Sequence, residues 1–374
     1  MINIHEGHGT DIQKAIAEAL QNITTVPSLL IYLVNGPELP ITAYTIYEQY
    51  PHIPTMGIPT YLYCNGQVDA ASIILLAFDD DTAVRCDIIH DLSHCPVQGI
   101  LPLEHNIADI SPGEDDTICL EFCTGNEETL ITTLNAVLES RHIPLIGTTI
   151  YGDLFHTGYI IGYNGHIYED SCVYAVIRNK KGRIRVYNEN IYGLRPGSSM
   201  HIATKVDRSR KALVELDGQP AAHVYSEELH IPLPDVVANV MHNPLGRMLG
   251  NNLFTFSMRE QLSDGTLLNF KQINLNDAIY FLELKDYPQI SQKTLRRIRQ
   301  ETPQISFVFS IDCVYRYMLY ASLGYLQTYA QNMHTLGPHV GITGAGEQYN
   351  TQHINQHMVC AVFEDKNMKV GEVI

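Results

Sequence analysis

Residues 117–153, TICLEFCTGNEETLITTLNAVLESRHIPLIGTTIYGD, decide the fold that we expect for this chain. The stretch opens with strand-forming residues at 117–125 and continues with a helical pattern over 126–141. It ends with a second, glycine-containing strand from 144, and a further strand, SCVYAVIRN, follows at 171–179. A strand, a helix and two more strands in this order predict one β-α-β-β unit.

The same order of elements occurs twice more. In each copy a glycine stands early in the second strand, at Gly57, Gly147 and Gly341. Repetition of this kind predicts an α/β fold with two lobes of mixed β-sheet and flanking helices, built from repeated β-α-β-β units; chance similarity between strand-helix-strand segments is the alternative. The first copy has SLLIYLVNG (28–36), TAYTIYEQY (42–50), TMGIPTYLY (55–63) and ASIILLAF (71–78), and the third has ISFVFSIDC (305–313), a single long helix at 315–333, HVGITGAGEQ (339–348) and HMVCAVFED (357–365).

Different material separates the second copy from the third. It predicts two strands joined by a basic turn, a helix that starts near Pro220, a β-meander with a turn at SDGT, and a helix at 290–302. We therefore expect two modules, at residues 25–215 and 216–366. Residues 1–24 are expected to contain an amphipathic helix that begins with a capping box of Thr10 and Gln13.

Composition excludes several classes of protein. The chain has 374 residues, enough for two domains. Its net charge of −17 argues against non-specific binding to nucleic acid or anionic membranes. Its apolar runs are too short to span a bilayer, and its start lacks the features of a secretory signal. Eight cysteines without a Cys-x-x-Cys pair indicate reduced thiols, so we expect a cytoplasmic protein.

The segment 339–357, HVGITGAGEQYNTQHINQH, has the composition of a phosphate loop or a metal site. A phosphate loop needs a helix after its glycines, and none is predicted here. His353 and His357 have the spacing of a zinc pair, but on a strand that spacing separates them too widely. The remaining interpretation is a strand with a bend that its glycines permit, and this strand presents Glu347.

Polar residues end the first strand of the third copy, at Asp312, Cys313 and Arg316. Ligands in open α/β sheets bind at the carboxyl ends of strands. Arg316 and Glu347 would there hold the two ends of an amino-acid-like ligand, or they would pair with each other as a structural salt bridge.

The order of LDGQPAAHVYSEEL, NPLG, FSMREQ, DGTLLNF, FSIDCVYR, GAGE and HINQHMVCAVFE resembles the FIST sensory family, and the likeness covers roughly residues 25–365. Cys313 and Arg316 resemble its Cys-x-x-Arg segment, and ITGAGE resembles its Thr-x-Gly-Glu strand with Gly344 added. INQH resembles its His-Asn-x-Thr segment, with His357 in the threonine place. In the N-terminal module Asp153 takes the place of a glutamate. The ligand-binding residues that this resemblance implies are Cys313, Arg316, Gly346, Glu347 and Asn355.

The resemblance implies a ligand sensor for signal transduction and no enzymatic activity. The expected partners are a histidine kinase or a cyclic-di-GMP signalling protein, and a homodimer stays open. Some members of the family are haem proteins that sense nitric oxide, so haem is one option for this chain. His242, at the end of an apolar helix-like run, is the first choice of axial ligand, followed by His353, His357 and His339.

Two alternatives stay open beside a haem sensor. One is a sensor that binds an amino acid or another metabolite without haem. The other is a cysteine-dependent enzyme with Cys313 as its nucleophile, for which the sequence offers no family signature.

Overall fold

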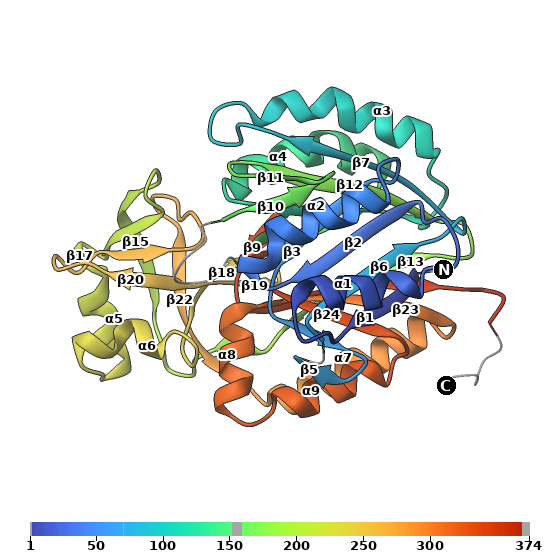
Figure 1. Ribbon diagram of the computed structural model, residues 1–374. Helices are drawn as coiled ribbons and strands as arrows, with labels where there is room; N and C mark the ends of the chain where they lie inside the picture. Colours follow the sequence, from blue (N-terminus) through green and yellow to red (C-terminus); the bar gives the residue numbers. More distant parts are fainter. Residues whose placement is uncertain (1, 70, 152–158, 369–374) are drawn as a thin grey trace.

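The structure, a computed structural model, describes residues 2–69, 71–151 and 159–368, and it divides into a large body and a smaller lobe (Figure 1). The lobe comprises residues 192–284 and lies to the left in Figure 1. The body contains three copies of one unit. Unit 1 spans residues 2–78, unit 2 spans 82–179, and unit 3 combines 184–190 with 287–364.

The three units share one topology. In each, the first strand of the predicted β-α-β-β sequence is parallel to the second and antiparallel to the last. An additional strand pairs with the last one, which gives the strand orders β1-β6-β2-β3, β7-β12-β8-β9 and β13-β26-β23-β24. The structure thus confirms the repeat and extends it by a strand.

The bounds of the elements in units 1 and 2 follow the predicted segments. Unit 1 has β1 (Ile2–Gly7), α1 (Ile12–Gln21), β2 (Leu29–Val34), α2 (Leu39–Gln49), β3 (Thr55–Pro59), β4 (Leu62–Cys64), β5 (Gln67–Val68) and β6 (Ile73–Phe78). Unit 2 has β7 (Thr82–Ile89), α3 (Ile100–Ile110), β8 (Thr117–Cys123), α4 (Glu127–Leu138), β9 (Leu145–Ile150), β10 (Ile161–Tyr163), β11 (His166–Tyr168) and β12 (Cys172–Asn179).

Unit 3 differs because the lobe interrupts it after its first strand. It has β13 (Ile184–Asn190), α7 (Tyr287–Glu301), β23 (Ile305–Cys313), α8 (Val314–Ser322), α9 (Leu326–His334), β24 (His339–Tyr349), β25 (Gln352–Ile354) and β26 (His357–Glu364).

The repeated glycine permits close approach to a side chain on the neighbouring strand. Gly57, Gly147 and Gly341 lie directly opposite Tyr32, Glu121 and Ser310, respectively. A Cβ atom at Gly147 would lie 2.4 Å from a carboxylate oxygen of Glu121, and one at Gly57 would lie 2.2 Å from the Tyr32 ring. Only glycine fits at these positions, which explains the sequence signal.

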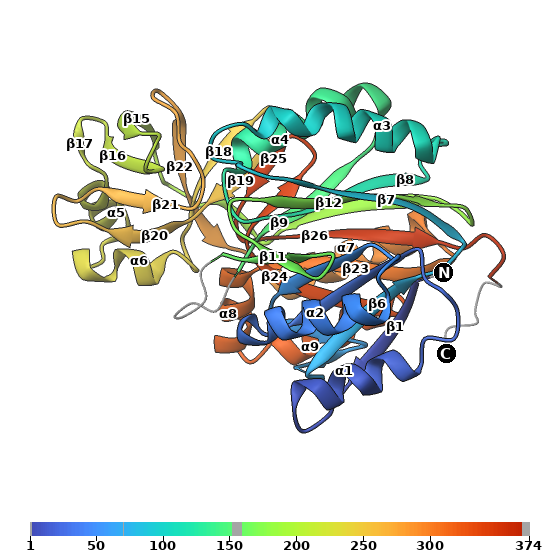
Figure 2. The same cartoon turned by 45° about the horizontal axis from the view of Figure 1, so that its top comes forward.

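The body is a stack of two sheets between two layers of helices (Figure 2). Units 2 and 3 join edge to edge through the antiparallel pair β9–β24, so strands from both predicted modules share one sheet. Strands β1, β6, β2 and β3 of unit 1 form the second sheet with the β10–β11 hairpin, whereas β4 of unit 1 pairs with β24 of the large sheet. The facing sides bury residues such as Ile31, Phe122 and Phe309. The α/β fold with mixed sheets is confirmed, whereas the division at residue 215 stays a prediction.

Helices cover the outer face of each sheet. Helices α1 and α2 pack on the sheet of unit 1. Helices α3 and α4 cover unit 2, and α7, α8 and α9 cover unit 3 on the same outer face.

The lobe has its own sheet and its own core. Its central strand order is β19-β18-β22-β15-β16-β21-β20, with α5 and α6 packed on one face. The two strands with a basic turn, the helix after Pro220 and the meander are all present. The elements are β14 (Tyr192–Leu194), β15 (Met200–Asp207), β16 (Ala212–Leu216), β17 (Gln219–Pro220), α5 (Ala221–Leu229), α6 (Val236–Asn239), β18 (Leu245–Leu249), β19 (Asn252–Phe256), β20 (Met258–Gln261), β21 (Leu267–Asn269) and β22 (Ala278–Leu284).

Two local predictions are wrong. The long helix at 315–333 is broken into α8 and α9, because Gly324 adopts a φ of 66° that a helix does not accommodate. The capping box at Thr10 is absent; the side chain of Asp11 instead accepts the Lys14 N–H at 2.9 Å. Asp153 lies outside the described residues.

Candidate functional site

The carboxyl ends of β9 and β23 meet at the middle of β24. Cys313 at the end of β23 is opposite Gly344 on one side of β24, and Ile150 at the end of β9 is opposite Gly344 on the other. The register shifts between Gly344 and Glu347, which marks an irregularity in the strand. Strand ends that converge in this way are where α/β proteins place ligands.

Arg316, on the first turns of α8, is completely buried inside an ion network. Its Nη2 donates to Glu189 of β13, and its Nε lies 2.9 Å from Asp312 Oδ1. The Tyr329 hydroxyl donates to both oxygens of Asp312 at 3.1 Å. Burial raises the pKa of Asp312 to about 7, although Arg316 and Tyr329 oppose this shift.

This network decides between the two roles expected for Arg316, binding a ligand carboxylate or pairing with Glu347. The guanidinium carbon also lies 4.9 Å from the ring centroid of Tyr320 and 5.2 Å from that of Tyr329. A guanidinium with two carboxylates and two aromatic rings around it is not free to take a ligand carboxylate in bidentate fashion. Nor does it form a salt bridge with Glu347, since its carboxylate partners are Glu189 and Asp312.

Glu347 lies beside Cys313 and is also fully buried. Its Oε2 accepts the His357 backbone N–H at 3.2 Å, and its carboxyl group contacts the Cys313 thiol. Burial raises the pKa of Glu347 well above its ordinary value. Burial, and then the neighbouring Glu347, raise the pKa of Cys313 well above that of a free thiol. Both shifts favour the protonated forms of the two groups.

Arg316 Nη1, Glu347 Oε1 and His357 Nε2 are buried and have no hydrogen-bond partner within the described part of the chain. The other ring nitrogen of His357 lies 2.7 Å from Asn188 Oδ1. Burial, followed by the charges of Arg316 and Lys271, lowers the pKa of His357 to about 3, so its ring is neutral. Unsatisfied buried polar atoms are costly, so each of these atoms favours the presence of a polar ligand or water beside it.

Gly346 and Asn355 have structural positions at the edge of this site. A Cβ atom at Gly346 would lie 2.3 Å from His353 Nε2 and 2.8 Å from Asn355 Nδ2, so a side chain is excluded there. Asn355 Oδ1 accepts the Ser257 N–H at 3.1 Å, which ties β25 to the lobe.

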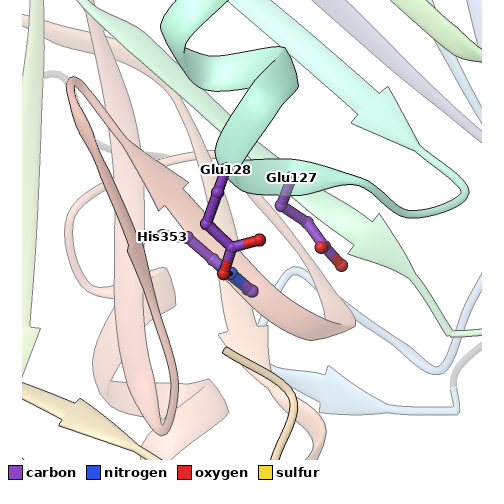
Figure 3. Close-up of side chains that lie close together, drawn as sticks. All are labelled: Glu127, Glu128 and His353. Atoms are coloured by element: carbon purple, nitrogen blue, oxygen red, sulfur yellow. Dashed lines mark hydrogen bonds and ion pairs between the residues drawn. The ribbon is translucent and has the colours of Figure 1, made fainter. Parts of the chain in front are cut away.

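A second ion cluster, which the sequence did not predict, lies at the start of α4 (Figure 3). Glu127 and Glu128 occupy the first turn of this helix, where its dipole favours negative charge. His353 Nδ1 lies 3.2 Å from Glu128 Oε1. The ammonium of Lys211, from the lobe, contacts Glu127 and lies 3.6 Å from Glu128 Oε2.

The three side chains in Figure 3 have the residue types of a metal site. Lys211 supplies the positive charge that a metal ion would otherwise supply. Burial opposes ionisation of Glu127, but the Lys211 ammonium outweighs it and holds the pKa of Glu127 below its ordinary value. We therefore interpret the cluster as an internal ion pair. The adjacent glutamates were visible in the sequence, but nothing connected them to a lysine 84 positions away.

Lys271 is a second buried lysine from the lobe. Its Nζ donates to the His353 carbonyl, and the described residues place no carboxylate within ion-pair distance of it. Burial, and then the charge of Arg247, lower its pKa to about 7.

Unit 1 carries an open groove at the carboxyl ends of β2 and β3. The groove has a volume of about 510 Å³ and its lining includes Asn35, Thr60, Tyr61 and Asp69. Asn35, Tyr61 and Asp69 are exposed, so this groove resembles an ordinary surface concavity.

Comparison with known proteins identifies the family. The family model described as the FIST N domain matches residues 29–219, which is half of the chain. The chain belongs to the FIST family. It is also 22% identical over 350 residues to an uncharacterized protein of Methanocaldococcus jannaschii, with 86% of this chain and 67% of that protein covered. The family assignment supports a role in signal transduction and sensing.

The histidine expected to bind haem does not fit that role in this FIST protein. His242 is exposed in the turn after α6, without the apolar enclosure that an axial ligand needs. His339 and His357 are completely buried and His353 nearly so, and each has a ring nitrogen beside a polar side chain: Ser310, Asn188 and Glu128, respectively. Within the described residues no helix is long and apolar enough to cross a membrane.

Proposed function

We propose that this FIST protein is a cytoplasmic sensor that binds a small polar metabolite, such as an amino acid, where β9, β23 and β24 meet. The observation that supports it is the unpartnered buried Oε1 of Glu347 beside Cys313, together with unpartnered atoms on two residues whose groups influence one another, Arg316 Nη1 and His357 Nε2. These residues offer a donor, a carboxyl group and a neutral imidazole. Cys313 borders the same place, and Gly346 and Asn355 shape its edge.

The ligand is held by neutral hydrogen bonds in this proposal. Arg316 is already paired with Glu189 and Asp312, and burial favours the protonated form of Glu347 because it raises the pKa of that group. We therefore expect amides, hydroxy compounds and zwitterions to bind in preference to dianions.

Thermal shift assays test the site. The purified chain is screened against amino acids, amides and hydroxy acids, and hits are repeated with Glu347→Leu, which removes the polar atoms, and with Asp69→Leu as a matched control in the groove of unit 1. We expect the shift to disappear in Glu347→Leu and to persist in Asp69→Leu. The reverse result would place the ligand in the groove of unit 1. The absence of any hit, by thermal shift and by calorimetry, would overturn the proposal.

Signal output is part of the proposal. A sensor acts only if its ligand distinguishes two states of the protein, and we propose that one of these states inhibits or activates a histidine kinase or a cyclic-di-GMP signalling protein. Autophosphorylation of a candidate kinase, measured with and without the chain and its ligand, tests this step.

The two other candidates make distinct predictions. For a haem sensor, haemin titration would give a saturable Soret band that is lost in His242→Ala; from the exposure of His242 we expect no such loss. For a cysteine-dependent enzyme, Cys313 would react rapidly with iodoacetamide near neutral pH. We expect slow labelling, because burial raises the pKa of its thiol and leaves little thiolate.

A further inference from the structure

The lobe is attached to the body by a narrow stem. Its first and last strands, β14 and β22, pair with each other, with Tyr192 opposite Leu284. Just outside the lobe, the Lys285 N–H donates to the Ile191 carbonyl at 3.0 Å. Both chain crossings therefore lie side by side, and the lobe has a core of its own. A unit with this connection can rotate as a rigid body about two adjacent backbone segments.

The surface between lobe and body has apolar and polar parts. Phe254 of the lobe belongs to the core cluster between the two sheets of the body, and Tyr192 and Leu282 belong to the cluster under α7, α8 and α9. Lys211 reaches Glu127 and Glu128, and the Gln272 N–H donates to Glu128 at 2.8 Å. Lys271 donates to the His353 carbonyl. Further contacts join the two parts: Ser257 N–H to Asn355 Oδ1 at 3.1 Å, Gln356 Nε2 to Ser257 Oγ at 2.7 Å, and Tyr315 hydroxyl to the Met258 carbonyl at 3.3 Å.

The polar part of this surface binds less firmly than its apolar part. Water can replace each of its hydrogen bonds when the parts separate, so closure gains little from them. Lys271 opposes closure, because its amine is buried without a carboxylate partner. Lys211 favours closure, because it neutralises two glutamates of the body.

The lobe covers the proposed ligand site. Phe270 packs with Tyr151, Val314 and Ala345, the last two being neighbours of Cys313 and Gly346. Ser257 contacts Asn355 and Gln356, and the Gln356 backbone N–H points at the Cys313 sulfur. These contacts place residues of the lobe over the carboxyl end of β23.

We propose that the lobe is a lid, which opens as a unit at its stem to admit the ligand and is held shut by the ion pairs of Lys211 with Glu127 and Glu128. The role of the lid in ligand entry rests on the proposed function, whereas its opening does not. Opening would expose Cys313 and change the shape of the molecule, which is the two-state element that a sensor needs.

Thiol labelling measures the opening. Iodoacetamide is added to the folded full-length chain at pH 8, and modification of Cys313 is followed by mass spectrometry, with Cys119 in the body core as the reporter of global unfolding. The variants are Lys211→Met and, as a matched control, Lys205→Met, whose exposed lysine pairs with Glu215 inside the lobe. We expect Cys313 to be labelled about tenfold faster in Lys211→Met, because an unpaired buried carboxylate disfavours closure. Cys119 should not change in either variant.

Amide exchange in the unmodified protein is the second measurement. The N–H groups of Ser257 and Gln272 bond to the body, whereas the Asn269 N–H donates to Lys211 inside the lobe. A lid that opens as a unit makes Ser257 and Gln272 exchange faster than Asn269. Equal exchange of all three, or equal labelling of Cys313 in Lys211→Met and Lys205→Met, would overturn the lid.

The two proposals fail separately. Fast Cys313 labelling in Lys211→Met without any thermal-shift hit would support the lid and contradict the proposed ligand site. A hit that depends on Glu347, together with unchanged labelling and exchange, would support the ligand site and contradict the lid.

Discussion

Units 2 and 3 each have charged side chains at the start of a helix, α4 after β8 and α8 after β23. The charges of these two clusters are neutralised in different ways. At the start of α4, Glu127 and Glu128 are paired with a lysine that comes from another part of the molecule. At the start of α8, Arg316 is buried completely, with carboxylates from its own unit. The first cluster can be taken apart by moving the lobe, and the second cannot. A reversible contact and a fixed scaffold thus lie at equivalent positions of one repeat.

The largest effect is expected when the fixed cluster is broken. Arg316→Met leaves Glu189 and Asp312 buried without a cation, so the free energy of unfolding should fall by about 3–5 kcal/mol in urea titrations. Arg85→Met is the control, because the pair of Arg85 with Asp109 is at least half exposed and should contribute at most about 1 kcal/mol. A loss of similar size in both variants would contradict the contrast between the clusters. Arg316→Lys keeps the charge and replaces Arg316→Met if that variant does not fold.

A smaller effect of opposite sign is expected at the contact between lobe and body. The pKa of Lys271 is lowered by burial to about 7, so the folded state favours its neutral form. Between about pH 10.5 and pH 7 the unfolded chain binds this proton and the folded chain does not, so stability falls as the pH falls through this range and then levels off.

Lys271→Met removes that dependence. We expect it to stabilise the protein by on the order of 2 kcal/mol at pH 7, and by much less near pH 10. Urea unfolding at both pH values measures this difference, with Lys205→Met as the exposed control. A constant difference between the two pH values would show that the amine is not protonated on unfolding in this range.

The smallest effect is expected at Glu347. Its folded pKa is raised well above 4.5 by burial, so the stability that its proton contributes is complete below about pH 4.5 and is lost as the pH rises through the folded pKa. Glu347→Gln resembles the protonated carboxyl group and should change stability by less than about 1 kcal/mol at neutral pH. The variant should also flatten the decline of stability above neutral pH. A large loss at pH 7 would indicate that Glu347 is ionised there.

The repeat was predictable because the same local constraint occurs in each copy. The second strand needs a glycine where it lies opposite a bulky or polar side chain, and the sequence has one at Gly57, Gly147 and Gly341. The sequence also placed Cys313 and Arg316 near Glu347, since strand ends collect polar residues, whereas their role in ligand binding stays a prediction. The partner of Arg316 was not found, because Glu189 lies 127 positions earlier on a strand that only sheet pairing brings close.

The lobe contacts were less predictable still. Lys211 belongs to a basic turn that looks like ordinary solvent-facing sequence, and its burial against Glu127 depends on how two separately folded parts meet. His242 shows the converse error. An apolar run before it suggested enclosure, but those residues fill the lobe core and leave the histidine in an exposed turn.

The stem at Ile191 and Lys285 has a consequence for how such a protein changes over generations. Because these two residues are hydrogen-bonded neighbours, the 93 residues between them leave and re-enter the body at one point. The body can therefore keep its three units while the segment inserted at this point varies in size and chemistry. Ligand recognition by the lobe can then change independently of the body.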